Sequence, residues 1–382
     1  MPKTIAITPS WYWPEAVDRV AGIPPFGIHE ICLARHARDK PDHPALITDD
    51  ATISFAELAT RVRQASQQLA AKIADAGSLV MDGERSVDSI ACLMGAFSLG
   101  LCARIVETEG PGAIAGRLDL SSLPPAGGIA EGPDIFETGN VHDVAVAIKG
   151  HGGIARHTHR SLLAGAISMA TFLQPAPDSA WLHTCSLDRW EGLLSLLLPL
   201  YLGEAVVLPS NTEGEGFADA IERHRPGYAI VDLSLAATAT RDAKRSVKKA
   251  RDILNSVLLS TPGLFDPGDR ERVGKSFRCP ALTFYGLAET GAIFASHPQW
   301  YMNESIGIPV TNAHVVPADP RNGSPIQTLW ELVESAEVTV KGPGLMAGYE
   351  NRNDLDYLTD GRFRTGVIAS SDANGMIYIL PD

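Results

Sequence analysis

Apolar and polar residues follow two different periods along most of the chain, which predicts helices and strands in alternation. The segment ISFAELATRVRQASQQLAAKI, residues 53–73, carries apolar residues at helical spacing, and Ser54 and Glu57 form a capping box at its start. Short apolar runs such as DVAVAIKG, GYAIVDL and SVLLS predict buried strands instead. This alternation indicates an α/β fold of mostly parallel sheets covered by helices.

The same pattern predicts further elements on either side of these runs. Strands are expected in LCARIVET, EAVVLP and ALTFYG. Helices are expected at about 28–39, 87–100, 188–201, 216–226, 239–254 and 267–275.

Changes in composition and hydrophobic pattern along the sequence predict four parts of the chain. The Gly- and Pro-rich stretch 108–140 predicts a linker, and from about residue 301 short β-rich stretches replace the alternation. The predicted units are an irregular lead-in at 1–27, a first α/β subdomain at 28–135, a second at 136–300 that holds the ligand cleft, and a β-rich lobe at 301–382.

Charge and composition narrow the class of protein. The chain has 382 residues and a formal net charge of −13, which argues against bulk binding of nucleic acid or of an anionic membrane. Its five cysteines form no C-x-x-C pair, so we expect reduced thiols and a cytoplasmic protein. The sequence shows neither a signal-peptide pattern nor an apolar run of about 18 residues, so no export signal and no membrane span are expected.

A glycine-rich loop follows the strand predicted in DVAVAIKG. In IKGHGGIARHTHRSLL, residues 148–163, Gly150, Gly152 and Gly153 free the backbone to approach a ligand closely. Thr158 is a good N-cap for a helix that follows. Loops that run into a helix in this way often cradle phosphate groups, but this one has no Ser or Thr among its glycines.

The string TFYGLAETG, residues 283–291, is the most informative in the chain. It places Tyr285 and Glu289 at and just beyond the end of a buried strand. An aromatic ring and a carboxylate at the carboxyl edge of a parallel sheet lie where open α/β sheets bind ligands.

Several motifs in fixed order give this string a family context. THRSLL, FYGLAE, SIGIPV, VKGPGLMAGY and GRFRTGVIASSDANGMIYIL resemble motifs of the adenylate-forming superfamily, over about residues 28–382. That superfamily contains acyl- and aryl-CoA synthetases, fatty acyl-AMP ligases, adenylation domains of peptide synthetases and luciferases. The resemblance implies a large N-terminal domain that uses ATP to convert a carboxylic acid into an acyl-adenylate, which is then passed to a thiol.

The resemblance also implies roles for individual residues. Tyr285 corresponds to the ring that stacks on adenine, and Glu289 to the Mg²⁺ ligand and catalytic carboxylate. Ala288 stands where the family usually has a Thr that contacts phosphate. The implied nucleotide-binding set is Gly150, Gly152, Gly153, Tyr285, Gly286 and Ala288.

A second set of positions corresponds to the family's acid pocket. The segment STPG, residues 260–263, resembles the glycine-rich segment that lines the adenine and acid sites. The start of the acid-pocket helix falls near residue 190, and Arg189 stands where an aromatic residue or His is usual. The implied acid-pocket set is Trp190, Gly192, Thr261, Pro262 and Gly263.

Three departures from the family pattern weaken the expected use of ATP. The phosphate loop lacks hydroxyl residues and is about three residues shorter than usual, and the family's RTGD reads RTGV, ending in Val367. The missing Asp is the residue that binds both ribose hydroxyls in the family. The chain also ends at Asp382, where the family's hinge begins, so the C-terminal domain with its adenylation lysine is expected to be absent. We therefore expect weak or no ATP use by this chain alone.

Three nearby side chains are candidates to replace the lost hydroxyl donors: Lys149, His151 and Arg156. His151 is also a tentative acid–base catalyst, because it lies inside the glycines. His157 and His159 lack acidic or Cys partners at ligand spacing, which favours structural roles over a metal site. Arg364 is expected either to form a salt bridge or to contact the nucleotide.

A run of cations predicts one charged face on the helix expected at 239–254. Its members are Arg241, Lys244, Arg245, Lys248 and Lys249. On an acidic protein such a face is suited to a carrier protein, a partner synthetase or the phosphates of coenzyme A, although an ordinary solvated face is the favoured explanation.

The sequence leaves three functions open. The first is an adenylate-forming ligase that works without its own C-terminal domain or borrows one from a partner. It would join a small carboxylic acid to coenzyme A or to a phosphopantetheine carrier. The second is a non-catalytic protein that binds an acyl group or an acyl-adenylate as a partner or scaffold. The third is an acyl transfer or condensation enzyme repurposed from the same fold, with His151 as its acid–base group.

Overall fold

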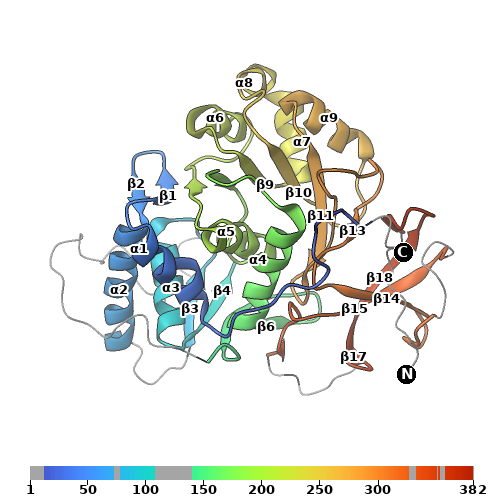
Figure 1. The fold of residues 1–382 in the computed structure, drawn as a ribbon, viewed down its shortest axis with the longest axis horizontal. Coiled ribbons are helices and arrows are strands. Elements are labelled where there is room, and N and C mark those ends of the chain that lie inside the picture. The colour runs from blue at the N-terminus through green and yellow to red at the C-terminus, as the bar shows by residue number, and fades with distance from the viewer. Residues whose placement is uncertain are drawn as a thin grey trace.

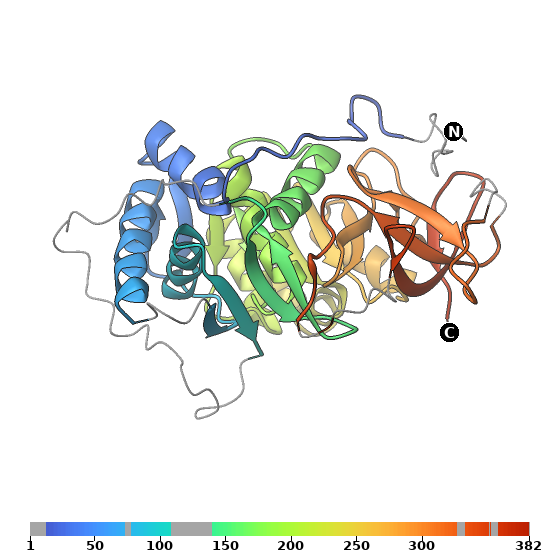
Figure 2. The ribbon, with the colours of Figure 1, turned by 90° about the horizontal axis from the view of Figure 1, so that it is seen from below.

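The computed structural model describes residues 13–72, 78–107, 140–326, 333–350, 352 and 358–381. The linker predicted at 108–140 lies outside this part of the chain except for Asn140, and so does the start of the lead-in. The body is elongated, with the N-terminal helices at one end of its long axis and the β-rich lobe at the other (Figures 1 and 2).

A nine-stranded sheet forms the centre of the molecule (Figure 1). Its six inner strands pair in parallel, whereas the strands at its two ends pair antiparallel. The strand order is β13 (Ile308–Pro309), β12 (Gly291–Ala295), β11 (Ala281–Leu287), β10 (Ser256–Ser260), β9 (Tyr228–Asp232), β7 (Trp181–His183), β8 (Val206–Leu208), β1 (Pro44–Thr48) and β2 (Thr52–Ser54). This arrangement confirms the predicted α/β fold.

Helices cover both faces of the central sheet, and its inner strands are therefore buried on both sides. Val257 and Leu259 of β10 pack into one core and Leu258 into the other, as alternation along a strand requires. The first core is closed by α6 (Glu215–His224), α7 (Leu233–Asp242), α8 (Lys244–Lys249) and α9 (Pro267–Phe277), and the second by α4 (His159–Leu173) and α5 (Trp190–Leu202).

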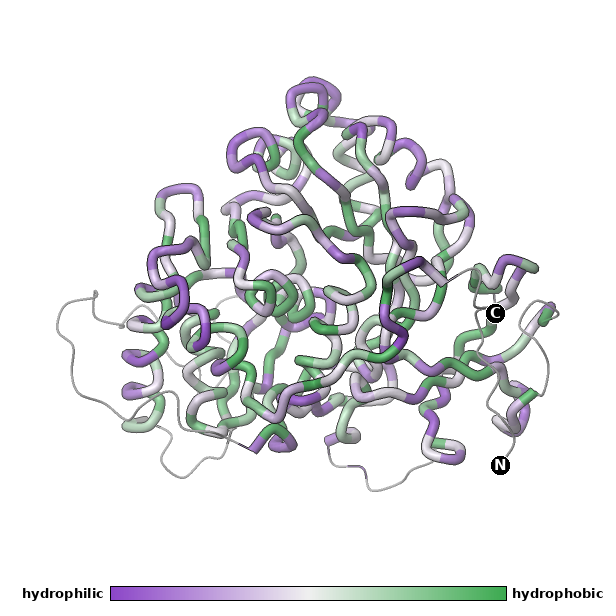
Figure 3. Tube along the Cα trace, viewed as in Figure 1, coloured by the Kyte–Doolittle hydropathy of each residue, from purple (hydrophilic) through white to green (hydrophobic). Residues whose placement is uncertain are grey.

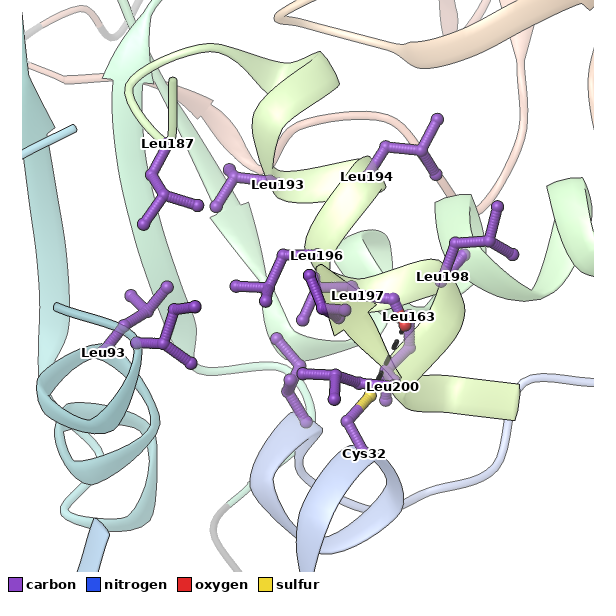
Figure 4. Close-up of a cluster of buried hydrophobic side chains, with 14 of the residues drawn as sticks. Cys32, Leu93, Leu163, Leu187, Leu193, Leu194, Leu196, Leu197, Leu198 and Leu200 are labelled. Carbon is purple, nitrogen blue, oxygen red and sulfur yellow. Dashed lines mark hydrogen bonds between the residues drawn. The ribbon is translucent and has the colours of Figure 1, made fainter. Parts of the chain in front are cut away.

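A second sheet shares the larger core with the first. Its order is β16 (Gly348–Tyr349), β6 (Ile154–Thr158), β5 (Val144–Lys149), β4 (Cys102–Val106) and β3 (Ser78–Asp82). Leucines of α5 pack against Leu93 of α3 (Val87–Ser98), Leu163 of α4 and Cys32 (Figure 4). This α5 core joins the two sheets into one body, which α2 (Phe55–Lys72), α1 (Arg35–Asp39) and the π-helix Glu30–Ala34 complete.

The third sheet is antiparallel and forms the lobe. Its strands are β14 (His314–Ala318), β15 (Ala336–Lys341), β18 (Arg362–Ser371) and β17 (Leu358–Thr359), with β19 (Ile377–Ile379) paired to β18. Two short strands from the same part of the chain pair elsewhere, because β13 extends the central sheet and β16 the second sheet. The predicted boundaries of the subdomains remain a prediction, and these two strands tie the lobe to the α/β body.

The N-terminal segment lies along one side of the body as a strap (Figure 2). Its described part, residues 13–27, contains no helix or strand, as the composition predicted. The Thr311 hydroxyl donates to the Asp18 carbonyl at 2.7 Å, and the Ala21 amide donates to the Asn312 side chain at 2.9 Å. These two hydrogen bonds join the strap to residues 311 and 312, which follow β13.

Local signals in the sequence were confirmed at helix starts. The Ser54 amide donates to the Glu57 carboxylate at 2.8 Å and the Glu57 amide to the Ser54 hydroxyl at 3.2 Å, which is the predicted capping box. Thr158 caps α4 by accepting the Ser161 amide at 3.1 Å. Figure 3 shows the expected hydropathy, with apolar strands inside and hydrophilic stretches on outer helices such as α8.

Two predictions of secondary structure were wrong. The glycine loop does not lead into a helix but turns into β6, whose alternating pattern is hidden by its Arg and His residues. The single helix expected at 239–254 is two helices, because α7 begins directly after β9 and the chain breaks at Ala243. Of the helices in the described ranges, none combines the length and apolarity needed to cross a bilayer.

A buried guanidinium fastens α9 to the start of the lobe. Arg270 is fully buried and donates to the carbonyls of Ala281 at 2.8 Å and of Met302 and Ser305 at 3.0 Å each. It also donates to the Ser296 hydroxyl at 2.8 Å. Burial lowers the pKa of Arg270 to about 10, so it stays charged at neutral pH.

We predict that Arg270→Met lowers the free energy of unfolding by about 3 kcal/mol, because it leaves several buried carbonyls without donors. Lys275→Met on the same helix is the matched control, since Lys275 is exposed and its ion pair contributes less than about 1 kcal/mol. Urea denaturation of both variants tests this, and equal losses in the two would contradict it.

Candidate functional site

A cleft of about 390 Å³ lies between the central sheet and the lobe. It brings together the strand end, the glycine loop and the segment after β10, but not Glu289. Its lining residues are His151, Pro262, Leu264, Tyr285, Leu287, Thr365, Gly366, Val367, Ile368, Ile379 and Leu380.

Tyr285 forms the inner wall of this cleft. Its ring is 4% exposed, and Gly263 lies against it with a backbone φ of 107°. A Cβ atom at Gly263 would lie 3.2 Å from the ring, so glycine is needed for this close approach. Burial, with a smaller contribution from Glu289, raises the pKa of Tyr285 to about 12, and the phenol is therefore neutral at physiological pH.

The glycine loop is the tip of a tight hairpin between β5 and β6. The Gly150 amide donates to the Gly153 carbonyl at 2.7 Å, which closes the turn around His151 and Gly152. Gly153 has a φ of 146°, a conformation that favours glycine. The glycines thus serve the turn itself, and the Gly150 N–H is already used inside it.

Glu289 lies beneath this hairpin rather than in the cleft. Its side chain is fully buried, and its Oε1 accepts the Gly152 amide at 3.1 Å and the Tyr349 hydroxyl at 2.9 Å. Its Oε2 is also buried and has no hydrogen-bond partner among the described residues. A Cβ at Gly150 would lie 2.5 Å from Oε1, so glycine is required here by the carboxylate.

A small apolar pocket lies on the other side of the β11–β12 turn. Its volume is about 30 Å³, and Gly291 of the turn lines it just as Leu287 lines the cleft. The Trp190 ring lies edge-on to Phe284 at 5.7 Å and forms one wall. The lining residues are Ile148, His157, Ser161, Leu162, Gly165, Trp190, Leu193, Leu194, Leu197, Gly291, Ala292 and Gly344.

Of the five implied acid-pocket residues, only two line either cavity. Trp190 lines the pocket and Pro262 lines the cleft. Gly192 lies instead against the backbone before α5, where a Cβ would come within 1.8 Å of the Ser186 carbonyl oxygen. Thr261 is buried, and its amide donates to the Phe284 carbonyl at 3.3 Å.

His157 was not assigned a role at the site from the sequence, yet it lines the pocket. Its Nε2 contacts the Ala288 carbonyl at 2.5 Å and its Nδ1 contacts the Ser161 hydroxyl at 3.1 Å. Burial lowers the pKa of His157, so the neutral ring donates to the carbonyl through Nε2. It thereby fixes Ala288 next to Glu289.

The other two histidines separate in space. His159 is buried, and its Nδ1 accepts the Ile28 amide at 3.3 Å; burial lowers its pKa to about 4, which supports the structural role. His151 is exposed at the mouth of the cleft. Within the described residues, no group of three His, Cys, Asp or Glu side chains is placed to hold a metal.

The RTGV segment of β18, residues 364–367, lines the cleft with Thr365, Gly366 and Val367. Arg364 pairs with the buried Glu337 at 2.6 Å, which confirms a salt bridge, and the Gly366 amide donates to the same carboxylate at 3.1 Å. The Thr365 hydroxyl donates to the Val338 carbonyl at 2.7 Å. Val367 therefore contributes a hydrophobic surface where the family pattern has a carboxylate.

An ionic network that the sequence did not reveal lies at the carboxyl edge of the central sheet. Arg189 precedes α5 and donates to both oxygens of Asp232, at 2.9 and 3.1 Å. It also donates to the buried Glu191 at 3.0 Å, which accepts the Ser260 hydroxyl at 3.1 Å. Arg189 is thus fully engaged by its own carboxylates.

The cationic face is less continuous than predicted, because the break at Ala243 divides it between two helices. Arg241 pairs with Asp269 at 3.0 Å and Lys249 with Glu222 at 3.1 Å. The exposed cations of α8 outside these two pairs are Lys244, Arg245 and Lys248.

Comparison with known proteins shows one family match and similarity to several CoA ligases. The sequence profile of the family described as AMP-binding enzyme matches residues 155–350. The chain is 23% identical to the 2-succinylbenzoate–CoA ligase of Bacillus licheniformis, over 92% of this chain and 79% of that ligase. It is 27% identical to the ligase of the same name from Bacillus velezensis over 56% of this chain, and the alignment spans only 43% of that relative. The fold matches O-succinylbenzoate coenzyme A synthetase from Bacillus subtilis in complex with ATP and a magnesium ion, with a TM-score of 0.79, 22% identity, and coverage of 92% of this chain and 79% of that one.

We predict opposite effects for two glycines in the packed helices α4 and α5. Gly192→Ala lowers the free energy of unfolding by about 2–3 kcal/mol, because its methyl group meets the backbone carbonyl of Ser186. Gly165→Ala is neutral or stabilising by up to about 1 kcal/mol, because a Cβ there meets no atom within 4 Å. Urea denaturation measures both, and losses of similar size at the two positions would contradict the assigned packing.

Proposed function

Because the chain belongs to the AMP-binding enzyme family, within the adenylate-forming superfamily, we propose that its cleft and its apolar pocket together bind an acyl-adenylate. Similarity to acyl-CoA ligases makes it a ligase-like protein of this class. The observation that carries the proposal is that the two cavities are lined by the two ends of one turn, Leu287 in the cleft and Gly291 in the pocket. A ligand that spans the turn has its nucleotide half in the cleft and its acyl half in the pocket.

The cleft suits the adenosine half of such a ligand. Tyr285 offers the face of a neutral ring, and Pro262, Leu264 and Ile379 add apolar surface around it. Stacking of an adenine on an aromatic ring contributes roughly 1–3 kcal/mol. Val367 provides no acceptor for the ribose hydroxyls, so stacking and apolar contact supply most of the affinity.

At about 30 Å³ the pocket must widen to admit an acyl group, but its apolar lining favours a group without a second charge. Its polar members, His157 and Ser161, contact each other and backbone carbonyls. The cation closest in sequence to the pocket wall, Arg189, is already paired with two carboxylates. A second carboxylate on the substrate would therefore be buried without a partner, which is costly. We propose a small uncharged aliphatic or aryl carboxylic acid as the substrate.

The described residues do not fit a metal ion as they are arranged here. Glu289, the position that corresponds to the Mg²⁺ ligand, is fully buried and bonded to Gly152 and Tyr349. Mg²⁺ keeps several of its waters when it binds, so a carboxylate ligand must be accessible to the hydrated ion. We therefore propose that the chain binds an adenylate more tightly than ATP and that its use of ATP alone is weak.

The enclosure of Glu289 also favours a second candidate function. A protein that binds an acyl-adenylate or an acyl group without making it needs the cleft and the pocket but not an accessible Glu289. Such a protein would serve as a partner or scaffold for a synthetase. Coenzyme A or a phosphopantetheine carrier remains the proposed thiol acceptor for the ligase function.

Calorimetry with non-hydrolysable acyl-sulfamoyl adenylates tests the proposal. A benzoyl or butanoyl adenylate analogue should bind at least tenfold more tightly than ATP and than an analogue whose acyl group carries a second carboxylate. Pyrophosphate exchange into ATP then separates the ligase from the non-catalytic protein. Absence of binding by every analogue would overturn the proposed function.

Val367→Asp should restore an acceptor for the ribose hydroxyls. Charge-assisted hydrogen bonds contribute about 1.5–3 kcal/mol each, so we predict that AMP and the adenylate analogues bind about tenfold more tightly or better. Val367→Asn is the matched control, because a neutral amide should give a smaller gain. Equal affinities of the three proteins for AMP would show that Val367 does not face the ribose.

The free cations of α8 remain a proposed docking surface for a carrier protein. Lys244→Glu with Lys248→Glu should weaken binding of an acidic phosphopantetheine carrier and flatten its salt dependence. The matched control reverses Arg38 and Arg321, which are exposed on α1 and on the lobe. If both double variants bind the carrier as the unmodified protein does, α8 is an ordinary solvated surface.

A further inference from the structure

The tip of the glycine hairpin is fastened to a third segment of the chain. Gly152 donates its N–H to Glu289 at 3.1 Å and accepts at its carbonyl from Arg352 at 3.3 Å. The Arg352 guanidinium lies 5.3 Å from the centre of the Tyr349 ring, and the Tyr349 hydroxyl donates to Glu289 at 2.9 Å. Both polar groups of the Gly152 backbone are therefore held.

Backbone pairing of the strand that carries Tyr349 sets the position of this residue. Strand β16 pairs with β6, with Gly348 opposite Arg156 and Tyr349 opposite Ala155. The Glu350 amide donates to the Ile154 carbonyl at 2.8 Å and continues this pairing. The Tyr349 ring is 3% exposed, so it has little freedom to leave the hairpin.

The hydroxyl of Tyr349 is a donor that stays protonated. Burial, reinforced by the neighbouring Glu289, raises the pKa of Tyr349 well above its ordinary value. A protonated phenol next to a carboxylate forms a charge-assisted hydrogen bond, which is about twice as strong as a neutral one. This bond competes directly with any other ligand for the Oε1 atom of Glu289.

The geometry points to Tyr349 as a positioning residue that latches Glu289 and the glycine hairpin together and so controls whether the carboxylate is available to a metal–phosphate ligand. The identity of the ligand rests on the proposed function, whereas the contacts among Tyr349, Glu289 and Gly152 do not depend on that function. Glu289 Oε2 is buried without a hydrogen-bond partner among the described residues, so the latch satisfies only one of the two carboxylate oxygens.

The glycines of the hairpin fit this latch. A Cβ at Gly152 would lie 2.4 Å from the Tyr349 hydroxyl oxygen, and one at Gly150 would lie 2.5 Å from Glu289 Oε1. Each glycine thus allows the backbone to lie directly on one of the two latch side chains. The pattern Gly-x-Gly is needed for this closed state whether or not a phosphate binds.

Tyr349→Phe tests the latch, because it removes the hydroxyl and keeps the ring. Titrations of ATP with and without Mg²⁺ give the metal-dependent gain in affinity, which should rise roughly tenfold in the variant, since one charge-assisted hydrogen bond no longer opposes opening. Affinity for a metal-free adenylate analogue should stay within about twofold. An unchanged metal-dependent gain would overturn the proposal.

Two further variants separate the latch from a general loss of packing. Tyr378→Phe removes a comparable hydroxyl–carboxylate bond, from Tyr378 to Asp372 at 2.9 Å in the lobe, and should leave the metal-dependent gain unchanged. Adding Glu289→Gln to Tyr349→Phe should remove most of the gain, because a neutral amide binds a divalent cation more weakly than a carboxylate does. A gain that persists in this double variant would contradict the role of Glu289.

Hydrogen exchange of the Gly152 amide tests the latch without any nucleotide. This amide should exchange about tenfold faster in Tyr349→Phe than in the unmodified protein or in Tyr378→Phe. Faster exchange without nucleotide binding in any protein would support the latch and refute the proposed function. Unchanged exchange in Tyr349→Phe together with adenylate binding would refute the latch and support the proposed function.

Discussion

A carboxylate is buried in a protein only where donors satisfy it, and the donors of Glu289 come from segments 137 and 60 residues away in sequence. Gly152 belongs to the β5–β6 hairpin, Glu289 to the β11–β12 turn and Tyr349 to β16. Meeting this one requirement aligns the second sheet, the central sheet and the start of the lobe. The same alignment places the two ends of the turn that carries Glu289, since Leu287 lines the cleft and Gly291 lines the pocket.

The charges around the site are balanced within the protein. Arg189 is paired with Asp232 and Glu191, Arg364 with Glu337, and Lys149 with Glu107 at 3.0 Å. Each pair places and neutralises a cation that could otherwise bind a phosphate or a carboxylate. A site built in this way gains affinity mainly from stacking and apolar contact, which is why we assign it an adenylate with an uncharged acyl group rather than a polyphosphate.

Several separate contacts with the α/β body and with the N-terminal strap position the lobe. β13 and β16 pair with strands of the two α/β sheets, and the buried Arg270 joins α9 to the residues before β13. The N-terminal strap adds hydrogen bonds at residues 311 and 312. The cleft wall that contains Val367 is therefore anchored to the wall that contains Tyr285, and the distance between them is fixed by the fold.

The sequence by itself determined the features that depend on neighbours along the chain. Strand and helix alternation, the capping box at Ser54, the N-cap at Thr158 and the ring and acid of TFYGLAETG all follow from local spacing. It did not determine β6 or the break after α7, because tertiary pairing and packing decided both against the local pattern. Only the tertiary structure decided that the glycines lie on Glu289 and Tyr349, that His157 lines the pocket and that Arg189 is already paired. These contacts join residues far apart in sequence, and nothing in local periodicity encodes which distant side chain will satisfy a buried charge.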